Sequence, residues 1–148
     1  MQSLPGEPFY NYAAMSSYPG MSVEDTATWN QFIVQYPNFC RHVHYNVRVG
    51  KGAYYSPNTP PNYQKMISDL SMLRIDAITI HSDIIRVIEV KPRGTTTAVG
   101  QLITYDQLLR EKFAQLPPTQ KTLVCITCPQ DIVSTLHSNG IELYQLSS

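Results

Sequence analysis

The sequence predicts a single α/β domain, and three of its features lead to that prediction. Its 148 residues suffice for one domain with a real core and hardly for two. Hydrophobic residues make up 43% of the chain and charged residues 15%, which is a globular composition. Helical and extended patterns alternate from residue 22 onward in the order α–β–(α)–β–β–α–β–α–β. No run of about 18 apolar residues occurs, so we expect no membrane-spanning segment and no membrane partner.

The first 21 residues are the least regular part of the chain. They are rich in Gly, Pro, Ser and Tyr and show no period, so residues 1–21 are expected to form an extended arm without regular structure, followed by one domain over residues 22–148. The arm contains more aromatic residues than a typical disordered tail. We therefore expect it to rest on its own domain or on a neighbouring subunit, where it would serve a homo-oligomer or an assembly partner.

Four helices are predicted from capping signals and from apolar residues at helical spacing. The first follows Ser22, which fits a capping box with Asp25, and it ends at Pro37. The others are expected at residues 63–70, 96–113 and 130–137.

Five strands complete the pattern. Residues 42–49 alternate apolar and polar side chains, which is typical of a half-buried strand. The strands at 73–81 and 84–91 are joined by Ser82 and Asp83, the natural two-residue turn of a hairpin. Residues 50–61 are predicted to be a loop or flap, and the last two strands are expected at 123–127 and 141–146.

Charge is distributed unevenly along the chain. Eleven Lys and Arg residues balance eleven Asp and Glu residues, yet residues 26–68 contain no acidic residue and carry a formal charge of +4. Such a segment suits a polyanion, and the alternative is a chance distribution over a loop-rich stretch. Contacts to the nucleic-acid backbone are expected from Arg41, His44, Arg48, Lys51 and Arg93, the last of which is equally well explained as a solvated side chain.

The predicted hairpin brings four charged side chains to one face of the sheet. With Ser82 and Asp83 as the turn, Asp76 lies opposite Glu89 and Arg74 lies opposite Lys91, with opposed Cβ atoms about 4.5–5.5 Å apart. The rest of this face is apolar, where carboxylates are costly unless they are paired or bind a metal.

Two interpretations of this cluster stay open. In the first, the carboxylates hold Mg²⁺ or Mn²⁺, and Lys91 orients or deprotonates a water or stabilises a phosphate. In the second, Arg74–Glu89 and Asp76–Lys91 are salt bridges that neutralise each other.

The same residues, read together with the next helix, resemble the PD-(D/E)XK nuclease superfamily. The pattern is Asp76, then Ile88-Glu89-Val90-Lys91, then Gln101-Leu-Ile-Thr-Tyr105, and it is closest to RecB-like and virus-encoded members. The resemblance spans most of the chain from residue 22. It implies a restriction-endonuclease-like core, in which a mixed sheet of about four to five strands is flanked by helices.

The resemblance also implies roles for individual residues. Asp76 and Glu89 would bind Mg²⁺ or Mn²⁺ with help from the backbone carbonyl of Val90. The remaining catalytic residues would be Lys91, Gln101 and Tyr105, the last two lining the site from the helix.

Two positions depart from the family pattern. Ile75 stands where many members have proline. Glu24 is the only candidate for the glutamate that relatives often direct from the first helix into the site, and we interpret it instead as favouring the helix dipole.

Cys125 and Cys128 have the C-X-X-C spacing of a redox or zinc motif. They fall within and just beyond a buried strand, so their sulfur atoms are expected to face opposite ways, and no second pair completes a zinc site. His42 and His44 share a strand face and are expected to touch solvent or phosphate. An odd number of cysteines and an N-terminus unlike a signal peptide favour an intracellular setting, in a bacterial or host cytoplasm.

Two functions from different classes follow. The first is a metal-dependent DNA endonuclease or exonuclease of the PD-(D/E)XK type, with DNA as partner and Mg²⁺ or Mn²⁺ as cofactor. The second is a catalytically silent protein of the same fold that serves as a virion component, for example in the neck, tail or connector of a bacteriophage. Neutral net charge and the Tyr- and Pro-rich arm favour the second function.

Overall fold

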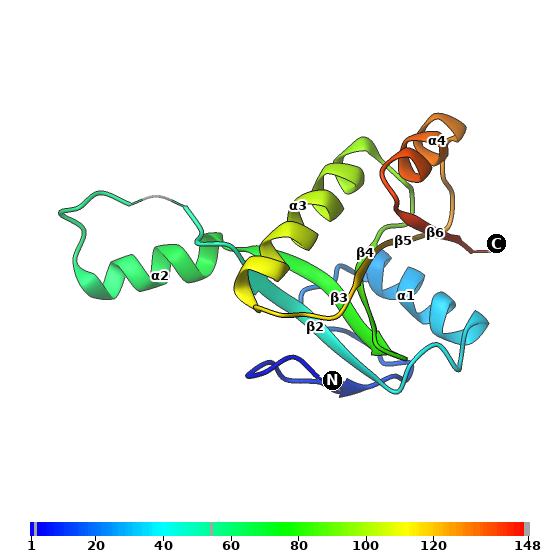
Figure 1. Ribbon diagram of the computed structural model, residues 1–148, viewed down its shortest axis with the longest axis horizontal. Coiled ribbons are helices and arrows are strands. Elements are labelled where there is room, and N and C mark those ends of the chain that lie inside the picture. The colour runs from blue at the N-terminus through cyan, green and yellow to red at the C-terminus, as the bar shows by residue number, and fades with distance from the viewer. Residues whose placement is uncertain (2, 54, 147–148) are drawn as a thin grey trace.

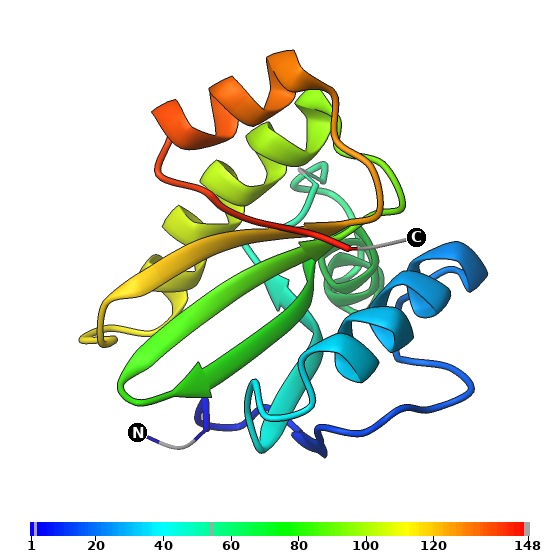
Figure 2. The same cartoon turned by 90° about the vertical axis from the view of Figure 1, so that its right-hand side faces the viewer.

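Six strands, taken in chain order, form one mixed sheet with helices on both of its faces (Figure 1, Figure 2). The computed structural model describes residues 1, 3–53 and 55–146, without the side chains of residues 68–71. The first four strands pair antiparallel, and the last two join in parallel. The strands are β1 (Tyr10–Asn11), β2 (His42–Val49), β3 (Leu73–His81), β4 (Ile84–Val90), β5 (Thr119–Cys125) and β6 (Glu142–Gln145).

The helices lie where the sequence pattern predicts them, with small shifts at their ends. Those of the described part of the chain are α1 (Val23–Gln35), α2 (Pro61–Ser71), α3 (Thr96–Lys112) and α4 (Gln130–Ser138). The α/β class is therefore confirmed. The sheet has six strands, one more than the four to five that were expected.

The additional strand comes from the N-terminal arm, which corrects the expectation that residues 1–21 lack regular structure. Tyr10 and Asn11 pair antiparallel with the edge of β2. Leu4 is buried and its N–H donates to Nε2 of His44 at 3.0 Å. The arm thus packs on its own domain, and its ordered aromatic residues do not require a neighbouring subunit.

Helix α1 covers one face of the sheet (Figure 2). Ser22 caps it as predicted, because its Oγ accepts from the N–H of Asp25 at 3.1 Å. Trp29 and Phe32 are fully buried against the sheet, with their rings stacked at 5.0 Å between centroids. This packing fixes the direction in which the first turn of α1 points.

Helices α3 and α4 cover the opposite face (Figure 2). Thr95 caps α3 by accepting from the N–H of Ala98 at 3.2 Å. Leu102 and Leu109 are fully buried against strand residues such as Ile78 and Val87. Helix α3 is therefore held across the strands that carry the predicted acidic residues.

The hairpin of β3 and β4 has the predicted register, with Ile80 opposite Ile85 and Ala77 opposite Ile88. Ser82 and Asp83 form its turn, and both have positive φ values of 50° and 65°. These are the backbone angles of a two-residue type I′ turn, which matches the twist of the flanking strands.

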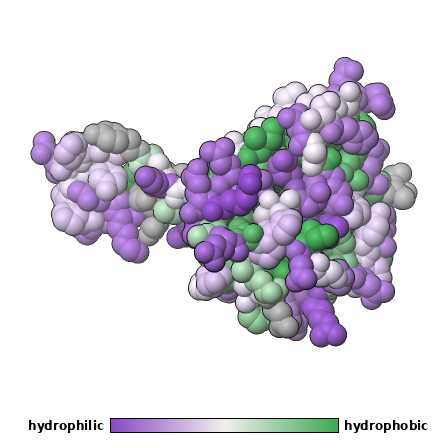
Figure 3. Space-filling view, in the orientation of Figure 1, coloured by the Kyte–Doolittle hydropathy of each residue, from purple (hydrophilic) through white to green (hydrophobic). Residues whose placement is uncertain are grey.

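Helix α2 stands apart from the body (Figure 1), and it packs against no other helix or strand within the described residues. Its surface in Figure 3 is mainly hydrophilic, although Tyr63 and Met66 are exposed on it. Residues 72 and 73, at the junction of α2 and β3, return the chain to the sheet beside the predicted site. In the described part of the chain, no helix combines the length and the apolar character needed to cross a membrane.

Candidate active site

All five residues predicted to be catalytic line a single cavity of about 400 Å³. The cavity lies at the open end of the β3–β4 hairpin, beneath α3. The residues are Asp76, Glu89, Lys91, Gln101 and Tyr105. Residues separated along the sequence are thus brought to one place by the hairpin register and by the packing of α3.

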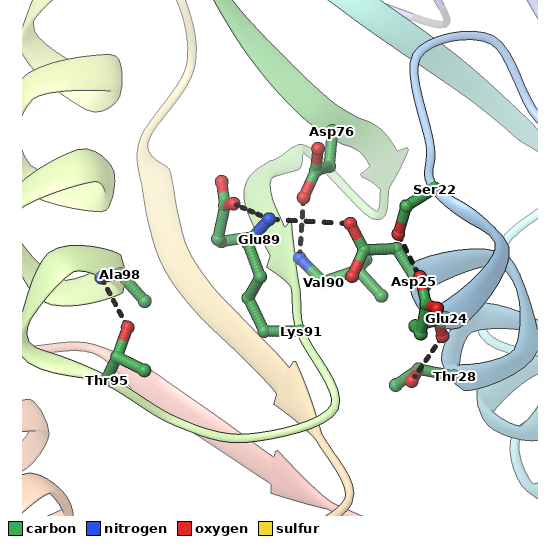
Figure 4. A network of polar contacts seen from close by, with 10 residues as sticks. All are labelled: Ser22, Glu24, Asp25, Thr28, Asp76, Glu89, Val90, Lys91, Thr95 and Ala98. Atoms are coloured by element: carbon green, nitrogen blue, oxygen red, sulfur yellow. Dashed lines mark hydrogen bonds and ion pairs between the residues drawn. The ribbon is translucent and has the colours of Figure 1, made fainter.

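The two acidic side chains come from neighbouring strands, as the register predicts. Asp76 accepts a hydrogen bond at Oδ2 from the backbone N–H of Val90, at 2.9 Å (Figure 4). This contact holds the carboxylate toward the strand that carries Glu89. Glu89 is 2% exposed, and its Oε2 is buried without a hydrogen-bond partner.

The environment makes both carboxyl groups reluctant to ionise. Burial raises the pKa of Asp76, although the Val90 N–H and the nearby Lys91 ammonium oppose that shift. Burial and then the charge of Asp76 raise the pKa of Glu89 to about 9. Because both carboxyl groups are largely buried, each is stabilised by binding a proton or a cation.

Lys91 supplies the positive charge of the site. Its Nζ lies 3.5 Å from Oε1 of Glu89 and 3.4 Å from Oδ2 of Asp25 (Figure 4). Burial acts to lower the pKa of Lys91, but the carboxylates of Glu89, Asp76 and Asp25 outweigh it and raise that pKa overall. The side chain is therefore an ammonium at neutral pH, which suits it to stabilise a phosphate rather than to deprotonate a water.

Asp25 is a site residue that the sequence interpretation missed. It lies in the first turn of α1, where its carboxylate reaches Lys91, whereas Glu24 is exposed and contributes only its backbone carbonyl to Thr28 (Figure 4). The exposure of Glu24 in the first turn of α1 agrees with its interpretation as a residue that favours the helix dipole, and the acid that α1 directs toward Lys91 is Asp25. The capping box in the sequence identifies Asp25 as a residue of the first helical turn. Whether its side chain faces the site depends on how α1 packs on the sheet.

Gln101 and Tyr105 project into the cavity from successive turns of α3. The Gln101 side-chain oxygen, Oε1, is buried without a hydrogen-bond partner. Burial, followed by the charges of Glu89 and Asp76, raises the pKa of the Tyr105 hydroxyl. Tyr105 is therefore a neutral hydrogen-bond donor at neutral pH.

Asn46 is a second residue that the sequence interpretation missed. It lies within β2 between Tyr45, which pairs with Ala77, and Val47, which pairs with Ile75. Its φ is 55°, a left-handed conformation that is rare inside a strand. Asn46 also lines the cavity, so the strand is distorted where it passes Asp76.

The two salt bridges expected from the hairpin register, Arg74–Glu89 and Asp76–Lys91, are not the ones that form. Arg74 makes no ion pair with Glu89, and Lys91 makes none with Asp76, among the described residues. Lys91 instead pairs with Glu89 and Asp25. Lys91 therefore faces three carboxyl groups, those of Glu89, Asp25 and Asp76, and Arg74 lines the same cavity as a second basic residue.

The donor set fits a hard divalent cation. Glu89 offers an unpartnered buried oxygen, and Asp76 offers a second carboxylate from the adjacent strand. Carboxylate and carbonyl oxygens are the ligands that Mg²⁺ and Mn²⁺ prefer. The described residues contain no group of three or more His, Cys, Asp or Glu side chains at metal-binding spacing, so further ligands would be backbone, water or substrate oxygens.

The residues predicted to contact DNA are not gathered in one place. Arg41 lines a separate cavity of about 550 Å³ beside the hairpin turn, at the other end of the sheet. Arg48 and Lys51 lie near the far end of β2, toward the cavity that Asp76 and Glu89 line. Arg93 is exposed two residues beyond Lys91.

His44 corrects the expectation of a phosphate contact. It is 2% exposed, with Nε2 accepting from Leu4 and Nδ1 lying 2.9 Å from the carbonyl oxygen of Pro8. Burial lowers the pKa of His44. Its ring therefore fastens the N-terminal arm and is closed to a phosphate, while His42 is only partly buried and lies edge-on to Phe9.

The two cysteines of the C-X-X-C spacing interact, which corrects the expectation that they face opposite ways. Burial raises the pKa of Cys125 to about 12, and the neighbouring Cys128 lies close enough to add to that rise. Strand β5 ends at Cys125, so strand alternation no longer governs Cys128. Gly94 is needed beside them, because a Cβ there would lie 2.7 Å from Sγ of Cys128.

Comparison with known proteins gives a distant structural likeness. No family model matches the chain, and no curated protein matches it. A structure of an EndoMS–dsDNA complex is similar over 88% of this chain and 48% of that one, with 19% identity and a TM-score of 0.48. A repair endonuclease from Pyrococcus abyssi is similar over 90% of this chain and 50% of that one, with 17% identity and a TM-score of 0.48.

The chain thus spans about half the length of these two endonucleases. A likeness this distant carries no argument about activity.

Proposed function

We propose that this protein is a metal-dependent nuclease of the PD-(D/E)XK type, which hydrolyses phosphodiester bonds in DNA with Mg²⁺ or Mn²⁺. One observation carries the proposal. Two acidic side chains from adjacent strands and one ammonium line the same cavity, and Glu89 there keeps a buried oxygen without a partner. Burying charged groups costs free energy unless they are paired or bind a cation, and acidic groups with raised pKa values in a cavity are typical of functional sites.

Asp76, Glu89 and the backbone carbonyl of Val90 would hold the cation. When bound there, a divalent cation supplies positive charge that polarises a phosphate oxygen and makes a water molecule a stronger nucleophile. The pKa values of Asp76 and Glu89 are raised in the metal-free protein. A bound cation would lower them again, so its binding would be accompanied by release of protons from these two acids.

Lys91 contributes a fixed positive charge to the same phosphate. Its ammonium is held between Glu89 and Asp25, and its side chain is 35% exposed toward the cavity. From that position it stabilises the negative charge that builds on the phosphate oxygens as the water oxygen forms its bond to phosphorus and the bond to the leaving oxygen breaks. The proton of the water ends on the leaving oxygen or in solvent.

Gln101 and Tyr105 would orient the water and the phosphate. The unpartnered Gln101 Oε1 is an acceptor for a water O–H, and the neutral Tyr105 hydroxyl is a donor to a phosphate oxygen. Both lie on α3, so the helix sets the distance between these groups and the strands.

Cleavage of plasmid and branched DNA in the presence of Mn²⁺ tests the proposal. We expect the wild-type protein to cleave, and Glu89→Ala and Lys91→Ala to lose at least about a hundredfold in rate. Glu111→Gln, on the exposed surface of α3, is the matched control and should cleave as the wild type does.

Equal cleavage by all of these proteins would show that a contaminant is responsible. An absence of Mn²⁺-dependent cleavage by the wild type would refute the proposal.

A further inference from the structure

A second cavity of about 390 Å³ adjoins the catalytic cavity. The two share Asn46 and Met72 in their walls. One wall is built by the N-terminal arm, through Glu7, Pro8 and Tyr10. None of the proposed catalytic residues lines it. The second cavity therefore adjoins the proposed active site but offers a different set of side chains to a ligand.

Flat apolar groups and a cation line this second cavity. Pro8 and Tyr10 come from the arm, Pro19 from the segment before α1, and Tyr45 from β2. The rings of Tyr10 and Tyr45 are 5.5 Å apart between centroids and tilted by 47°. Aromatic rings beside a positive charge are the pattern by which proteins bind the bases and phosphates of single-stranded nucleic acid.

The two basic residues that line the cavity, Lys112 and Arg48, differ in their contacts. The Lys112 ammonium donates to Oε1 of Glu7 at 3.0 Å and to the backbone carbonyl of Arg48 at 2.6 Å, so it fastens the arm to the end of β2. Arg48 is exposed, and its guanidinium makes no ion pair within the described residues. Arg48 is therefore the cation that is available to a ligand.

The volume of this cavity is in the range of pockets that hold one small molecule, roughly 300–1,000 Å³, and is too small for a base pair with both of its backbones. We propose that it is a subsite for one unpaired nucleotide, adjacent to the phosphate that is cleaved. Its base would stack on Tyr10 and its phosphate would bind Arg48. This inference rests on the proposed nuclease function and narrows the substrate to DNA with a single-stranded region.

Fluorescence anisotropy with Glu89→Gln as the parent protein tests the subsite without cleavage of the probe. The probes are a labelled single-stranded oligonucleotide and the duplex of the same sequence. We expect the single strand to bind more tightly. Adding Tyr10→Ala or Arg48→Ala should weaken that binding about fivefold to thirtyfold, whereas Tyr10→Phe keeps the aromatic ring and should bind as the parent does.

Arg41→Ala is the matched control for charge. Arg41 precedes β2 and lies about 23 Å along the strand from Arg48, so its removal reports the general electrostatic loss. We expect Arg41→Ala to lose less affinity for the single strand than Arg48→Ala does. Its loss of affinity should be the same for the single strand and for the duplex. Thermal unfolding of each variant verifies that the arm remains folded.

Three results would overturn the subsite. The first is an equal loss of single-strand affinity in Arg48→Ala and Arg41→Ala. The second is a duplex that binds as tightly as the single strand. The third is binding of deoxyadenosine monophosphate without binding of the oligonucleotide. Wild-type cleavage of DNA combined with any of them would leave the nuclease function standing and remove only the subsite. Absence of both cleavage and binding would remove the nuclease function itself.

Discussion

Replacing Glu89 with glutamine should stabilise the metal-free protein at alkaline pH, although it removes a proposed metal ligand. Glu89 is almost wholly buried, and one of its oxygens has no partner. The glutamine amide has the same shape, carries no charge and can donate to the neighbouring Asp76. The penalty of ionising a buried acid then disappears.

The magnitude follows from the raised pKa of Glu89, which is about 9 against an ordinary value of 4.5. Because the folded-state pKa lies above the unfolded value, the folded state keeps a proton that the unfolded chain releases. This stabilisation is complete below about pH 4.5 and is lost as the pH rises toward about 9. At about 1.4 kcal/mol per pKa unit, the wild type should lose about 4 kcal/mol relative to the variant between about pH 5 and about pH 8.

Thermal and urea unfolding in the presence of a chelator measure this difference. We expect Glu89→Gln to unfold about 10 °C above the wild type at pH 8 and close to it at pH 5. Glu111→Gln, on the exposed surface of α3, should follow the wild type at both pH values. Mn²⁺ should then raise the unfolding temperature of the wild type and leave that of Glu89→Gln unchanged. A variant less stable than the wild type at pH 8 would refute the reasoning.

Three further predictions concern the surroundings of the site and the core. Asp25→Asn should lower the rate of cleavage about tenfold or more by releasing the catalytic ammonium, while Glu24→Gln should leave it unchanged; equal effects would refute the role of Asp25. Trp29→Ala should lower the free energy of unfolding in urea by about 3–5 kcal/mol, because the side chain is fully buried, and a loss below about 1 kcal/mol would contradict that packing. Gly94→Ala should cost about 1–3 kcal/mol by crowding the Cys128 sulfur, and Cys128→Ala in the same chain should restore most of it; no recovery would contradict the contact.

The hairpin that carries the acids could be predicted from the sequence because its determinants are local. Short runs rich in apolar and β-branched residues mark both strands, and Ser82 and Asp83 between them form the left-handed turn that fixes their register. Once the register is known, the shared face of Asp76 and Glu89 follows.

Asp25 could not be identified in the same way, because its direction depends on contacts distant in sequence. Adjacent residues of a helix point about 100° apart, so either Glu24 or Asp25 can face the site, depending on how the helix is rotated. That rotation is set by the burial of Trp29 and Phe32 against the sheet, which the local pattern does not specify.

The arm and the cysteine pair show the same limit. The two-residue strand at Tyr10 is too short for a periodic signal and forms because His44 and the edge of β2 hold the arm in place. Strand β5 ends at Cys125, so the alternation of a strand does not set the direction of Cys128, which lies near Cys125. The left-handed φ of Asn46 has one local indication, because Asn is disfavoured in strands and is among the residues that adopt this conformation, but the alternation around it predicts a regular strand.

Calorimetric titration of Mn²⁺ into the wild-type protein and into Asp76→Asn tests the central claim most directly. The two buried acids are predicted to form one cation site, so the wild type should show a single saturable binding event that is lost in the variant. Identical isotherms for the two proteins, or no binding by the wild type, would show that the acids and Lys91 form only an internal charge cluster.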